Sequence, residues 1–382
     1  MSRRTTATAA ALSVLALGSP LIAGCRAQQI ATDKVSITPA GLNSDDILTI
    51  KEEIADLTMS IETNPQDANA YYNRGIAQNE LGNYLGAIAD FSKVIEINPQ
   101  DADAHHNRGF AASTLQDYQG AITDYTTAIK INPQYADAYN NRGSAREKLK
   151  DFEGAIEDYS KAIEINPQFS LAYYNRGAAK DKLGDFREAI DDNTKAIEID
   201  PQNENAYYNR AISKFKSKEY QGAIDDFDKA ILINSQYSLA YYNRGFAKST
   251  FQDYQGAIID YTKAININPQ YADAYLSRGA SKVEIGTYKE GIADYSKAIE
   301  INPQFSIAYY NRGIAKDKLK DYQGGIVDYS RAIEINPQFT LAFVNRGIAK
   351  EMIGDLKGAC EDWKEASSLG DKDAAEWVKK QC

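Results

Sequence analysis

The fold is decided by residues 170–203, which read SLAYYNRGAAKDKLGDFREAIDDNTKAIEIDPQN. In the first half, the residues of one helix face recur at spacings of three and four, namely Ala172, Tyr173, Arg176, Gly177, Ala179 and Leu183. Gly184 and Asp185 then predict a turn. The second half repeats the helical spacing with Phe186, Ala189, Ile190, Ala196 and Ile197. Asp200-Pro201 predicts its end, because proline disfavours a helical conformation in the residue before it. The stretch therefore predicts two helices joined by a short turn.

The same pattern recurs along most of the chain. The tripeptide Asn-Pro-Gln begins at Asn64, Asn98, Asn132, Asn166, Asn268, Asn302 and Asn336. Asp200-Pro201-Gln202 and Asn234-Ser235-Gln236 fill the two gaps. Each tripeptide therefore begins 34 residues after the one before it, as Asn98 follows Asn64. A 34-residue period of helical hairpins closed by proline resembles the tetratricopeptide repeat family. The resemblance covers nine repeats over residues 68–373 and implies an all-α, right-handed superhelical solenoid of helix-turn-helix units.

The segments beside the repeats predict caps and a tether. A solenoid needs polar caps, because its terminal hairpins would otherwise expose apolar surface. Residues 46–63 have the pattern of a lone second helix, and we expect residues 46–67 to form the N-terminal capping helix and its exit. Residues 371–382 predict a short amphipathic C-terminal capping helix. Residues 25–45 are polar and lack periodicity, which indicates a flexible tether.

The N-terminus has the three parts of an export signal. These are a basic start at Arg3 and Arg4, an apolar stretch over residues 7–23, and small residues before Cys25. Residues 21–25, Leu-Ile-Ala-Gly-Cys, resemble the bacterial lipobox. The resemblance implies a signal peptide over residues 1–24, a lipidated Cys25, and an exported, membrane-anchored bacterial lipoprotein on the periplasmic or cell-surface side. An ordinary cleaved signal peptide followed by a cysteine is the alternative.

The charge disfavours one class of partner. The formal net charge is −10 at pH 7. Nucleic-acid binding needs a basic stripe that makes many phosphate contacts, and an acidic surface repels phosphate. We therefore expect no nucleic-acid partner.

Two charged positions are constant in the nine repeats. Each repeat has arginine in its first helix and aspartate at a fixed distance from it in its second helix. We predict an ion pair across each hairpin, because the planar guanidinium can meet a carboxylate with two hydrogen bonds. The predicted pairs include Arg74 with Asp90, Arg176 with Asp192, Arg210 with Asp226, and Arg312 with Asp328. The alternative is two solvated charges that never meet.

The cysteines near the C-terminus predict a disulfide. Cys360 lies early in the last second helix, and Cys382 ends the capping helix. Two antiparallel helices of about ten residues return the chain to its starting level at about 1.5 Å per residue. An exported compartment permits oxidation, so we expect a Cys360–Cys382 disulfide. The alternative is a buried thiol at Cys360 and a frayed Cys382.

Known catalytic patterns are absent from the sequence. There is no P-loop, no dinucleotide fingerprint and no Cys-His nucleophile pair. The only histidines, His105 and His106, are neighbours on one predicted helix and face different directions, which disfavours a shared metal site. We therefore expect no enzyme activity, no metal and no cofactor.

Binding is then the expected role, and the family resemblance implies where. The first helices of such repeats line a concave wall, and eight repeats carry asparagine at the position that faces it: Asn73, Asn107, Asn141, Asn175, Asn209, Asn243, Asn311 and Asn345. Side-chain amides both donate to and accept from a peptide backbone, so this resembles an asparagine ladder that grips an extended chain. Neighbouring aromatic residues are Tyr72, Tyr174, Tyr208, Tyr242 and Tyr310. The alternative is that asparagine is only the usual residue of the repeat and that packing between repeats buries the stripe.

The expected function is a non-catalytic scaffold or adaptor that binds a protein or an extended peptide in this groove. The alternatives are a self-assembling structural solenoid and an accessory subunit of a membrane-associated assembly or secretion complex. The lysines of the chaperone-binding carboxylate clamp are missing, so that activity is not expected. Asn193, Ala211 and Ser235 depart from the repeat pattern, and we expect the weakest coupling between repeats over residues 193–235.

Overall fold

A computed structural model describes residues 43–382 of the protein. Over this range the chain forms 20 α-helices and no β-strand. The predicted signal peptide, Cys25 and most of the predicted tether lie outside the described residues. Among the helices of the described range, none has the length and apolar character that a membrane span requires.

Each repeat forms two helices, as the sequence predicts. The first helices are α4 (Ala68–Glu80), α6 (Ala102–Thr114), α8 (Ala136–Lys148), α10 (Ser170–Leu183), α12 (Glu204–Lys216), α14 (Ser238–Thr250), α16 (Ala272–Glu284), α18 (Ser306–Lys318) and α20 (Thr340–Met352). The second helices are α5 (Tyr84–Ile97), α7 (Tyr118–Ile131), α9 (Phe152–Ile165), α11 (Phe186–Ile199), α13 (Tyr220–Ile233), α15 (Tyr254–Ile267), α17 (Tyr288–Ile301), α19 (Tyr322–Ile335) and α21 (Leu356–Ser368). Helices α3 (Ser44–Thr63) and α22 (Lys372–Gln381) flank the repeats.

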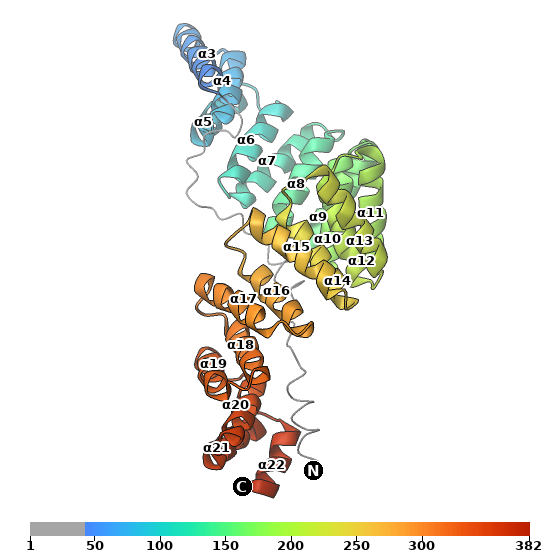
Figure 1. Ribbon diagram of the computed structural model, residues 1–382. Coiled ribbons are helices and arrows are strands. Elements are labelled where there is room, and N and C mark those ends of the chain that lie inside the picture. Colours follow the sequence, from blue (N-terminus) through green and yellow to red (C-terminus); the bar gives the residue numbers. More distant parts are fainter. Residues whose placement is uncertain (1–42) are drawn as a thin grey trace. The chain divides into compact units, whose positions relative to one another are not determined.

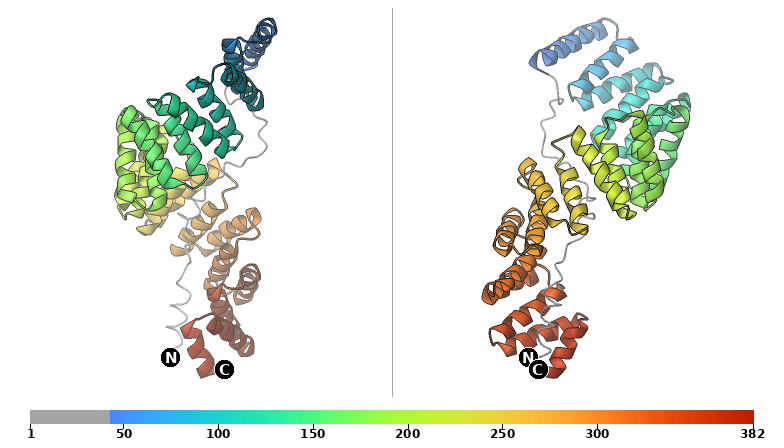
Figure 2. Two further views of the ribbon diagram at one scale, coloured as in Figure 1. Left: turned by 180° about the vertical axis from the view of Figure 1, so that it is seen from behind. Right: turned by 45° about the vertical axis from the view of Figure 1, so that its right-hand side comes forward.

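The chain divides into two compact parts between Asp226 and Phe227, within α13. We call residues 43–226 the N-terminal part and residues 227–382 the C-terminal part. From α3 to α12, and again from α14 to α22, each helix packs against the next, so each part is a stack of helical hairpins (Figures 1 and 2). The division falls inside the stretch where the sequence predicts the weakest coupling.

The turn that closes repeats 1 to 8 is held by the side chain of its first residue, which is asparagine except for Asp200 in repeat 4. Asn98 ends α5, and its side-chain Oδ1 accepts a hydrogen bond from the backbone N–H of Gln100 at 3.2 Å. Asn234 makes the same bond to Gln236 at 3.0 Å, although Ser235 stands in place of proline. The side-chain bond that holds the turn therefore forms without the proline.

The turn inside each hairpin needs a left-handed residue. Glycine supplies it in four repeats, for example Gly184 with φ of 92°. In the other five repeats a glutamine or lysine takes this conformation: Gln116, Lys150, Lys218, Gln252 and Lys320, with φ between 62° and 68°. Because left-handed backbone is unfavourable for residues with a Cβ, the packing of the two helices must impose it.

Buried alanines and one aromatic ring form the core of eight of the nine hairpins, and in repeat 4 the buried Asn193 takes the place of the ring. In repeat 3 the ring of Tyr159 is fully buried and lies against Gly143 of the first helix. A Cβ on Gly143 would stand 2.8 Å from Cε1 of Tyr159. The first helix can approach the ring only because it has glycine at this position.

We expect Gly143→Ala to destabilise the protein by about 2 kcal/mol, because the added methyl group overpacks a buried site. Gly222→Ala is the matched control, since its Cβ would meet only the flexible side chain of Lys214 at 3.3 Å. This control should be neutral or stabilising by about 0.5 kcal/mol, as expected for Gly→Ala within a helix. Urea unfolding followed by circular dichroism measures both, and equal effects would contradict the packing argument.

The N-terminal capping helix begins earlier than predicted. Helix α3 begins at Ser44, two residues before the predicted start, because Asn43 and Asp46 form a reciprocal capping box. It ends at Thr63, as the sequence predicts, and residues 64–67 form the turn into repeat 1. Thr58 of α3 receives a hydrogen bond from Arg74 at 3.0 Å. This helix therefore acts as the second helix of a preceding hairpin.

The C-terminal helix α22 covers the last hairpin. Ala374 is fully buried against α21, and the rings of Trp363 and Trp377 pack edge to face with centroids 5.3 Å apart. Cys360 and Cys382 are joined by a disulfide, with their Cα atoms 5.7 Å apart. The bond closes the end of the stack.

Candidate peptide-binding face

The constant arginine and aspartate of every repeat form a two-pronged ion pair. In the nine repeats, arginine Nη2 lies 2.5 to 2.7 Å from aspartate Oδ1. Arginine Nε lies 2.8 to 3.0 Å from Oδ2. The aspartates are at most 7% exposed. These pairs join the two helices of each hairpin, and they include all four pairs named from the sequence.

A second cation shares most of these carboxylates. In six repeats a lysine of the first helix places Nζ 2.7 to 2.8 Å from aspartate Oδ2: Lys180, Lys214, Lys248, Lys282, Lys316 and Lys350. Arg146 does the same in repeat 3 at 2.9 Å, and Gln78 donates a hydrogen bond to Asp90 in repeat 1. This position was not predicted, although a basic residue follows the arginine four places later in repeats 3 to 9.

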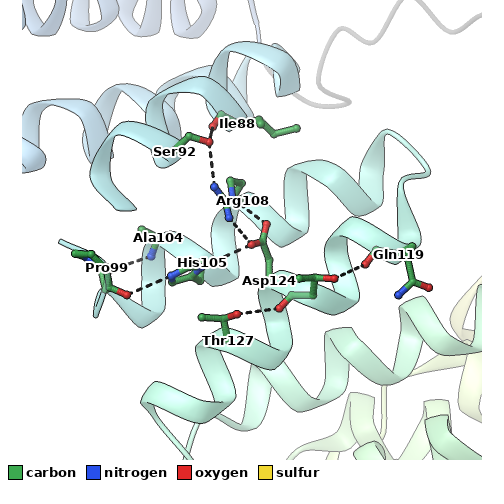
Figure 3. Close-up of polar contacts among 11 residues, drawn as sticks. Ile88, Ser92, Pro99, Ala104, His105, Arg108, Gln119, Asp124 and Thr127 are labelled. Atoms are coloured by element: carbon green, nitrogen blue, oxygen red, sulfur yellow. Dashed lines mark hydrogen bonds and ion pairs between the residues drawn. The ribbon is translucent and has the colours of Figure 1, made fainter. Parts of the chain in front are cut away.

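Each arginine also bonds to the preceding hairpin. Arg108 lies between Asp124 of its own repeat and Ser92 of α5, whose Oγ is 3.1 Å from Nη1 (Figure 3). The same bond reaches Ser or Thr in eight repeats at 3.0 to 3.1 Å. In repeat 6 Arg244 meets Asp228 instead, at 2.5 Å. The arginine therefore links the two helices of its own hairpin and also links that hairpin to the preceding helix.

Aromatic rings cover the guanidinium groups. In eight repeats the Cζ atom lies 5.4 to 5.7 Å from the ring centroid of the residue three places earlier, as with Arg176 over Tyr173. In repeat 2 that residue is His105, whose Nδ1 lies 3.6 Å from Asp124 Oδ1 (Figure 3). Every charge of this network has a partner within the protein, so we assign the network to the stability of the fold.

The predicted asparagine ladder makes bonds within the protein. Asn107 Nδ2 donates to the hydroxyl of Tyr72 in the preceding repeat at 2.9 Å, and Asn345 donates to Tyr310 at 3.0 Å. Asn175 Nδ2 donates to Asn140 Oδ1 at 3.0 Å. The ladder therefore joins neighbouring first helices, and this use was not predicted from the sequence.

In the C-terminal part the predicted groove residues are buried, which corrects the expectation of an open groove there. Tyr242 and Tyr310 are at most 1% exposed, and Asn243, Asn311 and Asn345 at most 2%. The ring of Tyr310 packs between Tyr329 and Phe339, with centroids 5.9 and 4.8 Å away, and Tyr242 packs in the same way on Tyr261 and Tyr271. These side chains therefore pack between neighbouring repeats and are not available to a ligand.

In the N-terminal part the same positions stay accessible. Asn73 is exposed, and seven other predicted residues are half-buried: Tyr72, Asn107, Asn141, Tyr174, Asn175, Tyr208 and Asn209. Phe110 of α6 adds a ring that is 44% exposed. These side chains come from consecutive first helices, α4 to α12. We call them the open face.

Comparison with known proteins agrees with this architecture. Profiles described as tetratricopeptide repeat or TPR repeat match residues 68–101, 114–150, 136–169, 170–203, 239–271, 281–319 and 306–339. Together these matches cover more than half of the chain. The chain belongs to the tetratricopeptide repeat family. Tetratricopeptide proteins bind proteins or peptides and are typically non-catalytic scaffolds.

Several solved tetratricopeptide structures are similar to this chain. A MamA protein is 29% identical over 44% of this chain and 92% of its own, with a TM-score of 0.42. YrrB, described as having an unusual peptide-binding site, is 23% identical over 49% and 96%, with a TM-score of 0.44. PilF of Pseudomonas aeruginosa is 20% identical over 57% and 97%, with a TM-score of 0.50. The PilF match shows the fold alone. No curated protein sequence matches this chain.

Among residues 43–382 no group of three or more His, Cys, Asp or Glu side chains is arranged to hold a metal ion. His105 contacts Asp124, whereas His106 lies 3.0 Å from Asn141 Nδ2. The two histidines therefore have different surroundings.

Proposed function

We propose that the protein is a non-catalytic scaffold that holds an extended segment of another protein on the open face. The observation that carries this proposal is the accessibility of amide and aromatic side chains on consecutive first helices of the N-terminal part. An amide can bond to a peptide backbone whatever its sequence, and partly exposed rings offer apolar contact. Such a face suits an extended chain better than a small molecule.

The partner is proposed as protein because the face is long and uncharged at its centre. Tyr72, Asn73, Phe110, Asn141 and Tyr174 carry no charge at neutral pH. Charged residues of the same helices, such as Asp103 of α6 and Lys148 of α8, are exposed. A neutral patch on a surface that also carries exposed charges is typical of a protein-binding surface.

Selection of peptides about 12 residues long from a displayed library on the full chain tests the proposal, because a segment of that length can span several first helices. Asn73→Ala with Phe110→Ala should weaken the selected peptides by roughly tenfold, because it removes an amide and an aromatic contact. The matched control replaces Thr123, Glu157 and Asp191 with alanine, which occupy equivalent exposed positions on α7, α9 and α11. Failure to select any peptide, or equal weakening by the control, would overturn the proposal.

We also propose that Cys25 anchors the scaffold to a bacterial membrane, on the periplasmic or cell-surface side. This rests on the lipobox-like residues 21–25 alone. Metabolic labelling of cells with an azido fatty acid should modify the wild-type chain and leave Cys25→Ser unmodified. Labelling of both chains, or of neither, would contradict lipidation at this residue.

A further inference from the structure

A continuous chain of side-chain hydrogen bonds runs along the open face through repeats 2 to 4. Asn175 Nδ2 donates to Asn140 Oδ1 at 3.0 Å, and Asn140 Nδ2 donates to Asn141 Oδ1 at 3.2 Å. Asn141 Nδ2 then faces His106 Nε2 at 3.0 Å. All three amides donate in the same direction, so the chain ends on the lone pair of His106. We call these four residues the amide relay.

His106 is the one member of the amide relay that titrates near neutral pH. In repeats 1 and 8 its position holds Tyr72 and Tyr310, whose hydroxyls receive the same bond from the next repeat. A tyrosine hydroxyl accepts this bond at any pH below its own ionisation. An imidazole accepts it only while Nε2 is unprotonated.

We propose that His106 is a pH switch that reverses the amide relay and so changes the hydrogen-bonding pattern of the open face. The inference rests on the proposed function, since it assigns a regulation to the same face. Protonated His106 presents an N–H toward the amino group of Asn141, and two donors cannot bond to each other. Asn141 must then turn its carbonyl toward His106.

The reversal passes to the other two amides. Once Asn141 has turned, its amino group faces Asn140, which must offer its carbonyl. Asn140 then points its amino group at Asn175, so Asn175 must in turn rotate its carbonyl toward Asn140. At the open face, the group that Asn175 offers to a ligand changes from a carbonyl to an amino group. A peptide that donates a hydrogen bond to Asn175 when His106 is neutral would therefore face a second donor once His106 is protonated.

The groups around His106 place the switch on the acid side of neutrality. Burial lowers the pKa of His106 below its ordinary value of 6.5. Asp137 of α8, Asp103 of α6 and a hydrogen bond with Asn107 oppose this effect without overcoming it. The rings of Tyr125 and Tyr135 flank the imidazole, with centroids 5.6 and 4.9 Å away. The neutral imidazole is thus the resting form.

Nitrogen-15 NMR of the two histidines tests the resting form directly. His105→Tyr leaves His106 as the only imidazole, because the chain has two histidines. At pH 8 we expect His106 to carry its proton on Nδ1, with Nε2 unprotonated. A proton on Nε2 at pH 8 would overturn the proposal, since Asn141 would then already accept the bond.

His106→Tyr is the decisive variant, because it keeps an acceptor as in repeats 1 and 8 but removes the titration. Peptides selected at pH 8 should bind the wild type and His105→Tyr about fivefold more weakly below the pH at which NMR shows His106 to be protonated, the value expected for one lost hydrogen bond. Their affinity for His106→Tyr should not change. The same loss in His106→Tyr would overturn the switch.

The test separates this inference from the proposed function. If no peptide binds at either pH, the proposed function fails, and the side-chain amide resonances decide the switch by themselves. In the wild type those of Asn141 and Asn175 should shift with the midpoint of His106. In His106→Tyr they should stay constant between pH 8 and 5. Resonances that ignore the titration of His106 would overturn the inference.

Discussion

Asp328→Asn should lower the free energy of unfolding by about 3 kcal/mol, the cost of removing one partner from a buried ion pair. Asp328 is 1% exposed and receives Arg312 Nη2 at 2.7 Å and Lys316 Nζ at 2.7 Å. Asparagine has a similar shape but no charge, so two partly buried cations lose their counter-ion. The loss exceeds that of a single hydrogen bond, because neither cation can reach full hydration where it lies.

Glu334→Gln is the control for Asp328→Asn, since it breaks another ion pair of the same helix. Glu334 pairs with Arg331 at 2.8 Å, but both side chains are largely exposed. Exposed pairs contribute little, so the control should change stability by less than about 0.5 kcal/mol. Urea unfolding curves measure both variants. A wild-type midpoint for Asp328→Asn would mean that the ion pairs add nothing to the fold.

The hairpins could be predicted because their signals are local. Helix period, turn glycines and the Asn-Pro-Gln closure all lie within a single repeat, and the repeat recurs nine times. The pairing of Arg74 with Asp90 could be inferred for the same reason, since both belong to one hairpin. The bond from Arg74 to Thr58 crosses to the preceding hairpin. This bond to the preceding hairpin was not predicted. The sequence nevertheless has Ser or Thr 16 residues before the arginine in eight of the nine repeats, as Thr58 stands before Arg74.

The role of the asparagines could not be read from the sequence. A helical period says which residues share a face, but the rotation between neighbouring hairpins decides whether that face meets solvent or the next repeat. Asn73 is exposed and Asn345 is 1% exposed, although both stand at the same position of the repeat. Asn345 donates to Tyr310 of the preceding first helix, whereas Asn73 lies in repeat 1 and no first helix precedes α4 among the described residues, so their surroundings depend on their place in the stack.

The second large effect is expected at Asp317, a buried acid of α18. Its Oδ2 accepts a hydrogen bond from Tyr329 at 2.6 Å, and its Oδ1 has no hydrogen-bond partner. Gly325 leaves room for it, because a Cβ there would stand 2.3 Å from Oδ1. Burial raises the pKa of Asp317 from 3.8 to about 7, and the hydrogen bond from Tyr329 opposes the rise. The nearby Asp321 and Asp328 raise it further, and Lys316 lowers it.

The sign of the pH effect follows from that shift. Between pH 3.8 and about 7 the folded protein holds a proton that the unfolded chain releases, so stability should fall as the pH rises through this window. Above it the ionised carboxylate destabilises the fold. Asp317→Asn removes the charge and should stabilise the protein at pH 8 by on the order of 2 kcal/mol. It should also flatten the dependence of the urea midpoint on pH between 4 and 7.

Asp181 is the internal control, because it occupies the position of Asp317 in repeat 4. There the next repeat supplies Ser213, whose Oγ lies 2.9 Å from Oδ1, and Lys216, which pairs with Oδ2. Repeat 9 has Ala349 and Met352 at those two positions, so Asp317 gains no such partners. Asp181→Asn should therefore destabilise at pH 8, opposite in sign to Asp317→Asn. Destabilisation by both variants would show that the folded protein stabilises the ionised carboxylate of Asp317. The predicted fall in stability with rising pH would then be wrong.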